Sequence, residues 1–528
     1  MRSFYKNGFV GAGVGLALVA LSYLGEQLLR LPFLPFDIFD WLARVLPGDL
    51  VTFGIDSIVN LIIALNIGAS TSGTAKQIEQ LLALLLFIFF WTLAGWLVGV
   101  VSQRSQFSAP QAGLSLALLV GGAIVIALNL PGVPDPFVLA WQLVLMLVGG
   151  WALGWILAGA PGEAATAAQR RHFLIQFGGA ILGFGLVSWG ISALFGREPV
   201  ETGADKVVES GAGGIETADV ATDPADLQDR LRPAPGTRRE LTSNDDFYRI
   251  DINTRPPLIE QTNWELQVDG LFANPRNLSL IDLMAFPAVT QPITLSCISN
   301  RIGGDLISTA EWTGVRLGLL LAELGLKPEA QALYIEAEDG FYESVSMTDM
   351  MDPRTLLVYA MNGQTLPQAH GFPLRIYIPN RYGMKQPKWI TRIEARTSAE
   401  EGYWVTRGWS QAARPHIVSI IDSVAADERT EAGRIPLGGI AWAGDRGIAQ
   451  VEIQVDDNPW QTARLRTPPL STLTWVQWRY DWQSEPGEHS FRVRATDGQS
   501  TLQVGQESSV RPDGATGYHT ITRTISQT

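Results

Sequence analysis

The stretch Pro292-Ile-Thr-Leu-Ser-Cys297-Ile-Ser-Asn-Arg-Ile-Gly-Gly304 contains the one cysteine of this 528-residue chain. Its first half is apolar and predicts a strand, and its second half is a glycine-rich loop that contains an arginine. A thiolate at a strand end is a good soft metal ligand, and the arginine and the loop amides suit an anion. The alternative is a small buried core side chain, which is what a lone cysteine usually is. One cysteine excludes an intramolecular disulfide and a cysteine-rich zinc site.

A second polar segment follows downstream. Its basic and histidine side chains, interleaved with glycine and proline, are His370, Arg375, Arg381, Lys385 and Lys388. Five such side chains would repel one another on an otherwise acidic domain, and a bound polyanion would resolve that conflict. The alternative is a basic face exposed to solvent.

The sequence after residue 196 predicts three regions. Strand-like runs alternate with short helices, for example those predicted over 279–284 and 315–324, and indicate an α+β domain over 244–412. Residues 413–528 show alternating strands and turns, which predict a small β-sandwich. The segment 197–243 is rich in Gly, Ala, Thr, Pro and acidic residues and predicts a flexible linker.

The first 196 residues have a different composition. They contain eight basic and eight acidic residues, so the net charge of −13 lies in the rest of the chain. A weaker candidate span at 49–68 contains Asp49 and Asp56, so the sequence leaves five or six spans open. Runs of the roughly 20 apolar residues that a helix needs to cross a bilayer predict a transmembrane helical bundle, with clear spans at about 8–29, 78–101, 110–129, 137–159 and 173–195.

Basic residues near the spans predict the orientation. Arg104 and the pair Arg170-Arg171 lie in alternate connections, and the connection 130–136 between them has no basic residue. The positive-inside rule therefore predicts a multi-pass protein of the cytoplasmic membrane, whose soluble half lies outside the cytoplasm. Gln169-Arg-Arg-His-Phe-Leu174 also resembles a twin-arginine export signal, and a plain positive-inside pair is the alternative.

Composition excludes several other functions. The acidic soluble half argues against nucleic acid as a partner. His172, at a flank, is the one histidine of the membrane half, which argues against a haem relay there. The spans contain few ionisable groups, so an anchor or a docking surface is favoured over a transporter.

The chain from about 246 to 400 resembles the sulfite-oxidase family of molybdopterin enzymes, and residues 414–500 resemble the immunoglobulin-like domain that follows in that family. The segment 307–317 resembles the family's continuation after the cysteine loop. The other motifs that carry the resemblance, in chain order, are Phe247-Tyr-Arg249, Cys297-Ile-Ser-Asn-Arg301, Tyr359-Ala-Met-Asn-Gly363, His370-Gly-Phe-Pro-Leu-Arg375 and Lys388-Trp389.

This resemblance implies a multidomain oxidoreductase: a transmembrane bundle, an α+β molybdopterin domain and an immunoglobulin-like β-sandwich. It implies that Cys297 binds the metal of a molybdenum–molybdopterin cofactor and acts in catalysis with Tyr359 and Arg249. The alternatives are a core tyrosine at 359 and a surface pair of Arg249 with Asp251, in which case Arg255 is the rival arginine. The residues that it implies for cofactor binding are Tyr248, Asn300, Arg301, His370, Arg375, Lys385 and Lys388.

Two departures from the family affect the substrate. Sulfite oxidases have two successive arginines in the cysteine loop, and the second is Ile302 here, which weakens the case for sulfite. Asp246-Phe-Tyr248 resembles the Asn-Phe-Tyr of periplasmic methionine-sulfoxide reductases, with Asp in place of Asn. The expected reaction is oxygen-atom transfer on a sulfite-like anion or a sulfoxide.

The expected partners follow from the same reading. No segment resembles a cytochrome b5 domain, so we expect a separate electron carrier, either a cytochrome or a quinone-linked protein. The resemblance also implies a homodimer through the sandwich. The competing class is a non-catalytic binding module on the same fold, tethered to the membrane.

Overall fold

The computed structural model describes residues 2–65, 67, 70–130, 135–160, 165–195, 216–217 and 231–526. The chain forms two compact units, and both are made of two segments: Met1–Asn60 with Thr74–Glu201, and Leu61–Gly73 with Thr202–Thr528.

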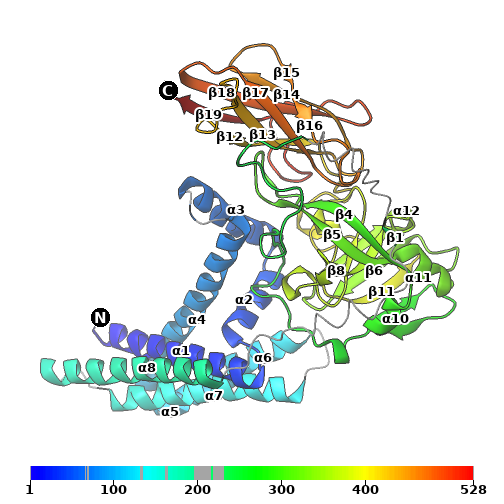
Figure 1. The fold of residues 1–528 in the computed structure, drawn as a ribbon. Coiled ribbons are helices and arrows are strands. Elements are labelled where there is room, and N and C mark those ends of the chain that lie inside the picture. Colours follow the sequence, from blue (N-terminus) through cyan, green and yellow to red (C-terminus); the bar gives the residue numbers. More distant parts are fainter. Residues whose placement is uncertain are drawn as a thin grey trace. The chain divides into compact units, whose positions relative to one another are not determined.

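Helices form the N-terminal part of the chain (Figure 1). Among the described residues, five helical stretches are long and apolar enough to cross a membrane, and they contain most of each of the five spans predicted from the sequence. The weaker sixth candidate corresponds to α3, which is not among them. The elements are α1 (Arg2–Leu29), α2 (Leu34–Val45), α3 (Gly48–Leu65), α4 (Thr71–Arg104), α5 (Ala109–Leu116), the π-helical turn η1 (Ala117–Gly121), α6 (Gly122–Asn129), α7 (Pro136–Gly159) and α8 (Ala167–Phe195).

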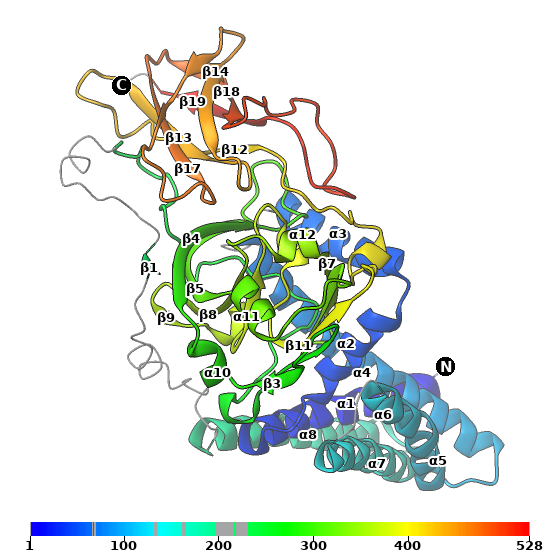
Figure 2. The same cartoon turned by 90° about the vertical axis from the view of Figure 1, so that its right-hand side faces the viewer.

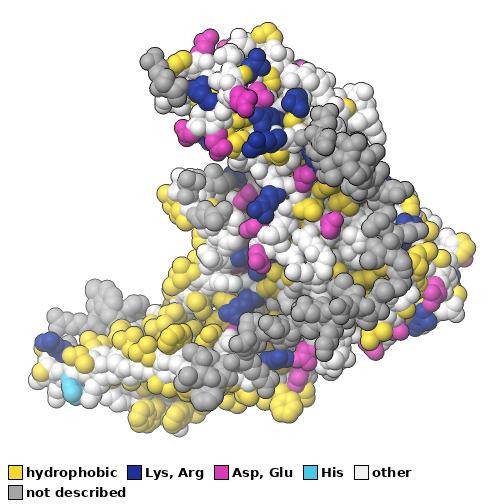
Figure 3. All heavy atoms as spheres, in the orientation of Figure 1, with side chains coloured by type: hydrophobic (Ala, Val, Ile, Leu, Met, Phe, Trp, Pro, Cys, Tyr) yellow, Lys and Arg dark blue, Asp and Glu magenta, His cyan; other side chains and the backbone are white. Residues whose placement is uncertain are grey.

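Small residues allow these helices to pack closely. A Cβ added to Gly11 of α1 would lie 2.1 Å from the carbonyl oxygen of Trp91 in α4, and one added to Gly113 of α5 would lie 2.1 Å from that of Gly150 in α7. Such glycine contacts are typical of helices that pack within lipid. Large apolar side chains remain exposed on the outside of the helices, and Figure 3 shows them covering much of the helical unit.

The second unit contains two sheets that share one core. The first sheet has the order β1-β4-β5-β8-β10, with β9 paired to β8, and the second has the order β3-β2-β11-β6-β7. In this region, the described strand pairs β1–β4 and β2–β11 are parallel, and the others are antiparallel. The strands are β1 (Glu216–Thr217), β2 (Leu266–Gly270), β3 (Arg276–Leu278), β4 (Ala288–Ser296), β5 (Ile307–Arg316), β6 (Ala332–Ala337), β7 (Tyr342–Ser346), β8 (Leu356–Met361), β9 (Gln364–Thr365), β10 (Arg375–Tyr377) and β11 (Ile390–Arg396).

Short helices and 3₁₀ turns connect these strands (Figure 2). The predicted helix at 279–284 is confirmed as α10, because Ser279 caps it and exchanges hydrogen bonds with Asp282. The predicted helix over 315–324 begins later, at Leu317, because residues 315 and 316 still pair with β8 at the end of β5. The elements are η2 (Gln261–Asn263), α10 (Leu280–Met284), α11 (Leu317–Glu323), α12 (Met347–Met350), η3 (Gln368–His370), η4 (Gly383–Lys385) and η5 (Val405–Arg407).

The last part of the chain is a two-layer β-sandwich. One sheet has the order β12-β13-β17-β16 and the other β15-β14-β18-β19, and both are antiparallel. Side chains from both sheets, among them Leu437, Trp478, Ile453 and Phe491, form its buried core. The strands are β12 (Val418–Val424), β13 (Ile435–Trp442), β14 (Ile448–Val455), β15 (Gln461–Thr462), β16 (Arg464–Leu465), β17 (Val476–Trp482), β18 (Gly487–Asp497) and β19 (His519–Ile525).

The predicted linker 197–243 is described only in part, since 197–215 and 218–230 lie outside the described residues. Its last residues, from 231 onward, pack against the sandwich instead of forming a free tether. Arg238 pairs with Asp422 of β12 at 2.7 Å, and its carbonyl oxygen accepts a hydrogen bond from Gln477 of β17.

Candidate active site at Cys297

Cys297 follows directly after β4 and begins a small closed loop. Its backbone N–H donates to the carbonyl oxygen of Leu306 at 2.9 Å, which closes the loop. The side chain of Asn300 accepts the N–H of Leu306 at 3.0 Å, and the N–H of Asn300 donates to the Cys297 carbonyl oxygen at 3.1 Å. The loop therefore has a fixed shape of its own, and Asn300 stabilises it from within.

The Cys297 thiol is buried, with the residue 8% exposed. Burial raises the pKa of this thiol because the thiolate loses its hydration. The hydroxyl of Ser299, 3.0 Å from the sulfur, and the backbone N–H groups of Ser299 and Ile298 act in the opposite direction. A metal cation bound to the sulfur would stabilise the thiolate more fully than these groups do.

The Phe247-Tyr248 segment lies beside this loop. The Phe247 ring meets the rings of Trp312 and His370 edge to face, with centroids 5.4 Å apart in both pairs. A Cβ added to Gly383 would lie 3.0 Å from the Tyr248 hydroxyl and 3.5 Å from the carbonyl oxygen of Ser296. Tyr248 therefore lies close to the residue that precedes Cys297.

Charges at Cys297 and at Arg375 both act on Tyr248. Burial raises the pKa of the Tyr248 phenol, a negative charge at Cys297 raises it further, and the Arg375 guanidinium lowers it. Residues from three segments far apart in the sequence therefore lie near one another.

His370 is neutral in this environment. Burial and the nearby cations Lys388, Arg375 and Arg249 lower its pKa to about 4, although the hydrogen bond with Asn244 acts in the opposite direction. Its Nε2 lies 2.8 Å from the carbonyl oxygen of Asn244, to which it donates, so Nδ1 is the hydrogen-bond acceptor. His370 can therefore orient a ligand but adds no positive charge at neutral pH.

The positive charge comes from three other side chains. Arg375 is 6% exposed, donates to the carbonyl oxygen of His370 at 3.0 Å and lies 4.8 Å over the Trp312 ring. Burial lowers the pKa of Arg375 to about 10, so it remains protonated. Arg249 and Lys388 both contact one Asp251 oxygen, at 2.7 and 3.3 Å.

Asp251 is the partner that the sequence analysis allowed for Arg249 as an alternative, but the pair is not a surface pair, because the Asp251 side chain is fully buried. Its one carboxylate cannot neutralise two cations. Moreover, Nη2 of Arg249 is buried and has no hydrogen-bond partner among the described residues. The cluster therefore retains positive charge and at least one unused donor, as an anion site requires.

Gly371 brings the cationic segments together. Its φ of +116° lies in the left-handed region, and an added Cβ would lie 3.0 Å from the Cβ of Arg375 and 3.1 Å from that of Lys388. A larger residue would push these two chain segments apart.

Lys385, which the resemblance implies for cofactor binding, has a buried acidic partner. Its ammonium group lies 2.9 Å from a carboxylate oxygen of Glu343, and both side chains are almost fully buried. This ion pair is the partner observed for Lys385, and its role in cofactor binding stays a prediction.

The structure also shows the surroundings of three other residues from the sequence analysis. Tyr359 belongs to the hydrophobic core together with Leu357 and Ala360, which is the alternative that the sequence left open for it. Arg301 follows Asn300 in the loop, is half-buried, and accepts the N–H of Gly304 through its carbonyl oxygen. Asp246 is exposed and accepts a hydrogen bond from the Ser243 hydroxyl at 2.6 Å.

The sequence analysis missed Ser299, whose hydroxyl contacts the Cys297 sulfur, and Trp312, on which Arg375 lies. Ser299 stands in the quoted loop, so its position two residues after the cysteine was a usable signal. Trp312 carries no such signal, because a tryptophan in a strand predicts a core residue.

We expect Lys388→Met to weaken binding of inorganic phosphate to the metal-free protein by roughly tenfold, the effect of one charged hydrogen bond. Burial lowers the pKa of Lys388 to about 8, so wild-type binding should fall as the pH rises from 7.5 to 9.5 and the ammonium loses its proton. Titration calorimetry across this range measures both effects. The exposed Lys327→Met is the control, and an equal pH dependence in the Lys388 variant would contradict the assignment.

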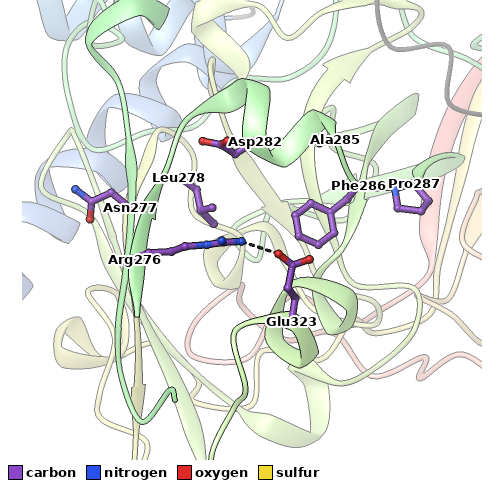
Figure 4. A pocket seen from close by; sticks show the side chains of 8 residues that line it. All are labelled: Arg276, Asn277, Leu278, Asp282, Ala285, Phe286, Pro287 and Glu323. Carbon is purple, nitrogen blue, oxygen red and sulfur yellow. Dashed lines mark hydrogen bonds and ion pairs between the residues drawn. The ribbon is translucent and has the colours of Figure 1, made fainter. Parts of the chain in front are cut away.

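The chain also has a surface pocket of about 430 Å³, which contains none of these residues (Figure 4). Arg276 and Glu323 face one another across it at 2.6 Å, and both are about half exposed. Asp282 also lines the pocket, and its carboxylate accepts hydrogen bonds from Ser279. The charges that line the pocket are therefore acidic on balance, which does not suit an anionic ligand.

Comparisons with known proteins agree with the Cys297 site. A family model described as "oxidoreductase molybdopterin binding domain" matches residues 253–404. Human mitochondrial sulfite oxidase is 28% identical over 304 residues, which are 49% of this chain and 56% of that protein. The uncharacterized oxidoreductase YuiH of Bacillus subtilis is 33% identical over 187 residues, which are 35% of this chain and 91% of that protein.

Among solved structures, the sulfane dehydrogenase SoxCD from Paracoccus pantotrophus aligns with a TM-score of 0.47 and 21% identity, over 56% of this chain and 89% of that chain. The chain spans only about half the length of the mammalian sulfite oxidases that it matches.

The residues at Cys297 fit a molybdopterin cofactor. A buried thiol at a strand end is a soft metal ligand, and Arg249, Arg375 and Lys388 supply the charge that a phosphate needs. When bound, such a cofactor supplies two-electron oxygen-transfer chemistry. The chain therefore belongs to the molybdopterin-binding oxidoreductases of the sulfite-oxidase type, and its cofactor is molybdenum bound to molybdopterin.

Proposed function

We propose that this protein is a membrane-anchored enzyme that transfers an oxygen atom to or from a small substrate outside the cytoplasmic membrane. The observation that carries the proposal is that the buried thiol of Cys297 and the buried guanidinium of Arg375 both lie close enough to Tyr248 to act on its pKa. A non-catalytic module has no need for a buried thiol and a buried guanidinium near one tyrosine, since both are costly without a ligand.

The chain's own residues have separable tasks in this reaction. Cys297 holds the metal at a fixed place, because its loop is closed by hydrogen bonds. Arg375 and Lys388 bind the anionic part of the cofactor, and His370 orients it without adding charge. Tyr248 remains protonated because its pKa is raised, and so can donate a hydrogen bond close to Cys297.

The proposed substrates are a sulfite-like anion and a sulfoxide. Oxidation of sulfite takes an oxygen atom from water and releases two electrons and two protons, whereas reduction of a sulfoxide consumes these and releases water. The unused Nη2 donor of Arg249 can hydrogen-bond to the oxygen of either substrate. Electrons would pass to or from a separate carrier, a cytochrome or a quinone-linked protein.

The apolar helices and the basic residues support the proposed location. In the part of the chain that the structure describes, five helices have the length and composition of membrane spans. Arg104 ends α4, and Arg171, in the first turns of α8, is exposed. With both on the cytoplasmic side, the chain after α8 would lie outside. A role of the Arg170-Arg171 pair in twin-arginine export, an immunoglobulin-like class for the sandwich and a dimer through it belong to the same proposal.

One assay tests the activity and the location together. Intact spheroplasts that contain the full chain are given sulfite with ferricyanide, which does not cross membranes, or a sulfoxide with a reduced viologen dye. We expect turnover of one substrate class at the same rate before and after lysis. Turnover only after lysis would contradict the location, and no turnover after lysis, in protein that contains molybdenum, would contradict the activity.

A further inference from the structure

The β-sandwich contacts the Cys297 loop at two glycines. A Cβ added to Gly303 of the loop would lie 2.3 Å from Nε2 of His519, so the imidazole lies directly against the loop backbone. In the reverse direction, Cδ1 of Ile302 lies 2.6 Å from where a Cβ of Gly517 would be. Both glycines have a φ in the left-handed region, at +71° and +134°, so both contacts depend on the missing side chain.

His519 has a fixed orientation. It is the first residue of β19 and pairs with Val493 of β18. Its Nδ1 accepts the backbone N–H of Ile421 in β12 at 3.0 Å. Since Nδ1 is the acceptor, the proton of the neutral ring is on Nε2, the atom that faces Gly303.

Gln503 holds the segment before His519 in place. This buried side chain donates to the Gly517 carbonyl oxygen at 2.8 Å and accepts hydrogen bonds from Ser419 and from the N–H of Ala495, at 2.7 and 3.0 Å. The segment that contacts the loop is thus tied to strands of both sheets and forms a rigid support.

A displacement at Gly303 would reach Cys297. The loop between them is short, and it is closed by the bond from Cys297 to Leu306 and by the side chain of Asn300. A loop closed in this way moves as one piece, so the position of its tip affects the position of the sulfur.

We propose that His519 is a positioning residue for the metal site, which holds the loop so that the Cys297 sulfur keeps its place and its burial. The sandwich would then be a part of the catalytic machinery and not only an appended domain. The effect of His519 on catalysis rests on the proposed function, whereas its effect on the position of the Cys297 sulfur can be tested without it.

The test uses the full chain made in a host that cannot synthesise molybdopterin. Cys297 is the only cysteine, so the rate of alkylation by iodoacetamide reports on this one sulfur. We expect His519→Ala and Gly303→Ala each to raise the rate roughly tenfold. This factor corresponds to a loss of about 1.4 kcal/mol in the free energy that keeps the loop in its closed position. The matched control is His489→Ala, on β18, whose ring nitrogens bind Asp456 and Glu485.

The double variant gives the sharper result. Gly303→Ala should have less effect when His519 is already alanine, because the imidazole that its Cβ would meet is gone. In cofactor-loaded protein, the molybdenum(V) EPR signal should shift in both single variants and not in the control. Wild-type alkylation rates in His519→Ala and Gly303→Ala, in protein that unfolds at the wild-type temperature, would overturn the proposal, whether or not the loaded enzyme is active.

Discussion

Replacing Cys297 with serine is expected to remove molybdenum from the purified protein and to lower turnover by more than about 100-fold, since loss of a group that only hydrogen-bonds to a metal ligand already costs about 10- to 100-fold. A serine hydroxyl is a harder and more weakly ionised ligand than a thiolate, and burial further disfavours its ionised form. Metal analysis and the rate per protein molecule measure the two effects.

The His489→Ala variant is the control, because this residue lies in the sandwich away from the loop. Molybdenum retained in Cys297→Ser at the wild-type level, together with wild-type turnover, would show that the thiolate does not bind the metal.

Glu343→Gln is expected to destabilise the second unit by about 3–5 kcal/mol, because it leaves the buried ammonium of Lys385 without its carboxylate. For a unit of this size we expect the midpoint of thermal unfolding to fall by roughly 10 °C. The double variant Glu343→Gln with Lys385→Met removes both charges and should recover most of this loss.

Differential scanning calorimetry of the three proteins measures these shifts. Glu323→Gln, in the half-exposed pair with Arg276, is the matched control and should change stability by less than about 1 kcal/mol. The double variant should also keep its cofactor. Loss of the cofactor with full recovery of stability would return Lys385 to the cofactor site and contradict its structural role.

The sequence predicted the elements of the site that depend on local patterns. Cys297 follows a strand, Ser279 caps a helix, and both positions can be predicted from residues within a few positions. His370, Arg375 and Lys388 lie near one another, because Gly371 has no side chain and lets the segments of Arg375 and Lys388 approach it closely.

Features that depend on distant residues could not be predicted. The partner of Lys385 is 42 positions away on β7, and the support of the Cys297 loop comes from His519 on the last strand. The predicted helix over 315–324 loses its first two residues to β5, because pairing with β8 outweighs the local preference. The protonation state of His370 could not be predicted either, because the lowered pKa of its imidazole comes mainly from burial in the folded protein.

X-ray absorption at the molybdenum edge of the purified full chain counts the sulfur ligands of the metal. We expect molybdenum in the wild-type protein to have one more sulfur ligand than molybdenum loaded into Cys297→Ser, or the variant to hold no metal. An equal number of sulfur ligands in the two proteins would contradict the assignment of Cys297 as the ligand.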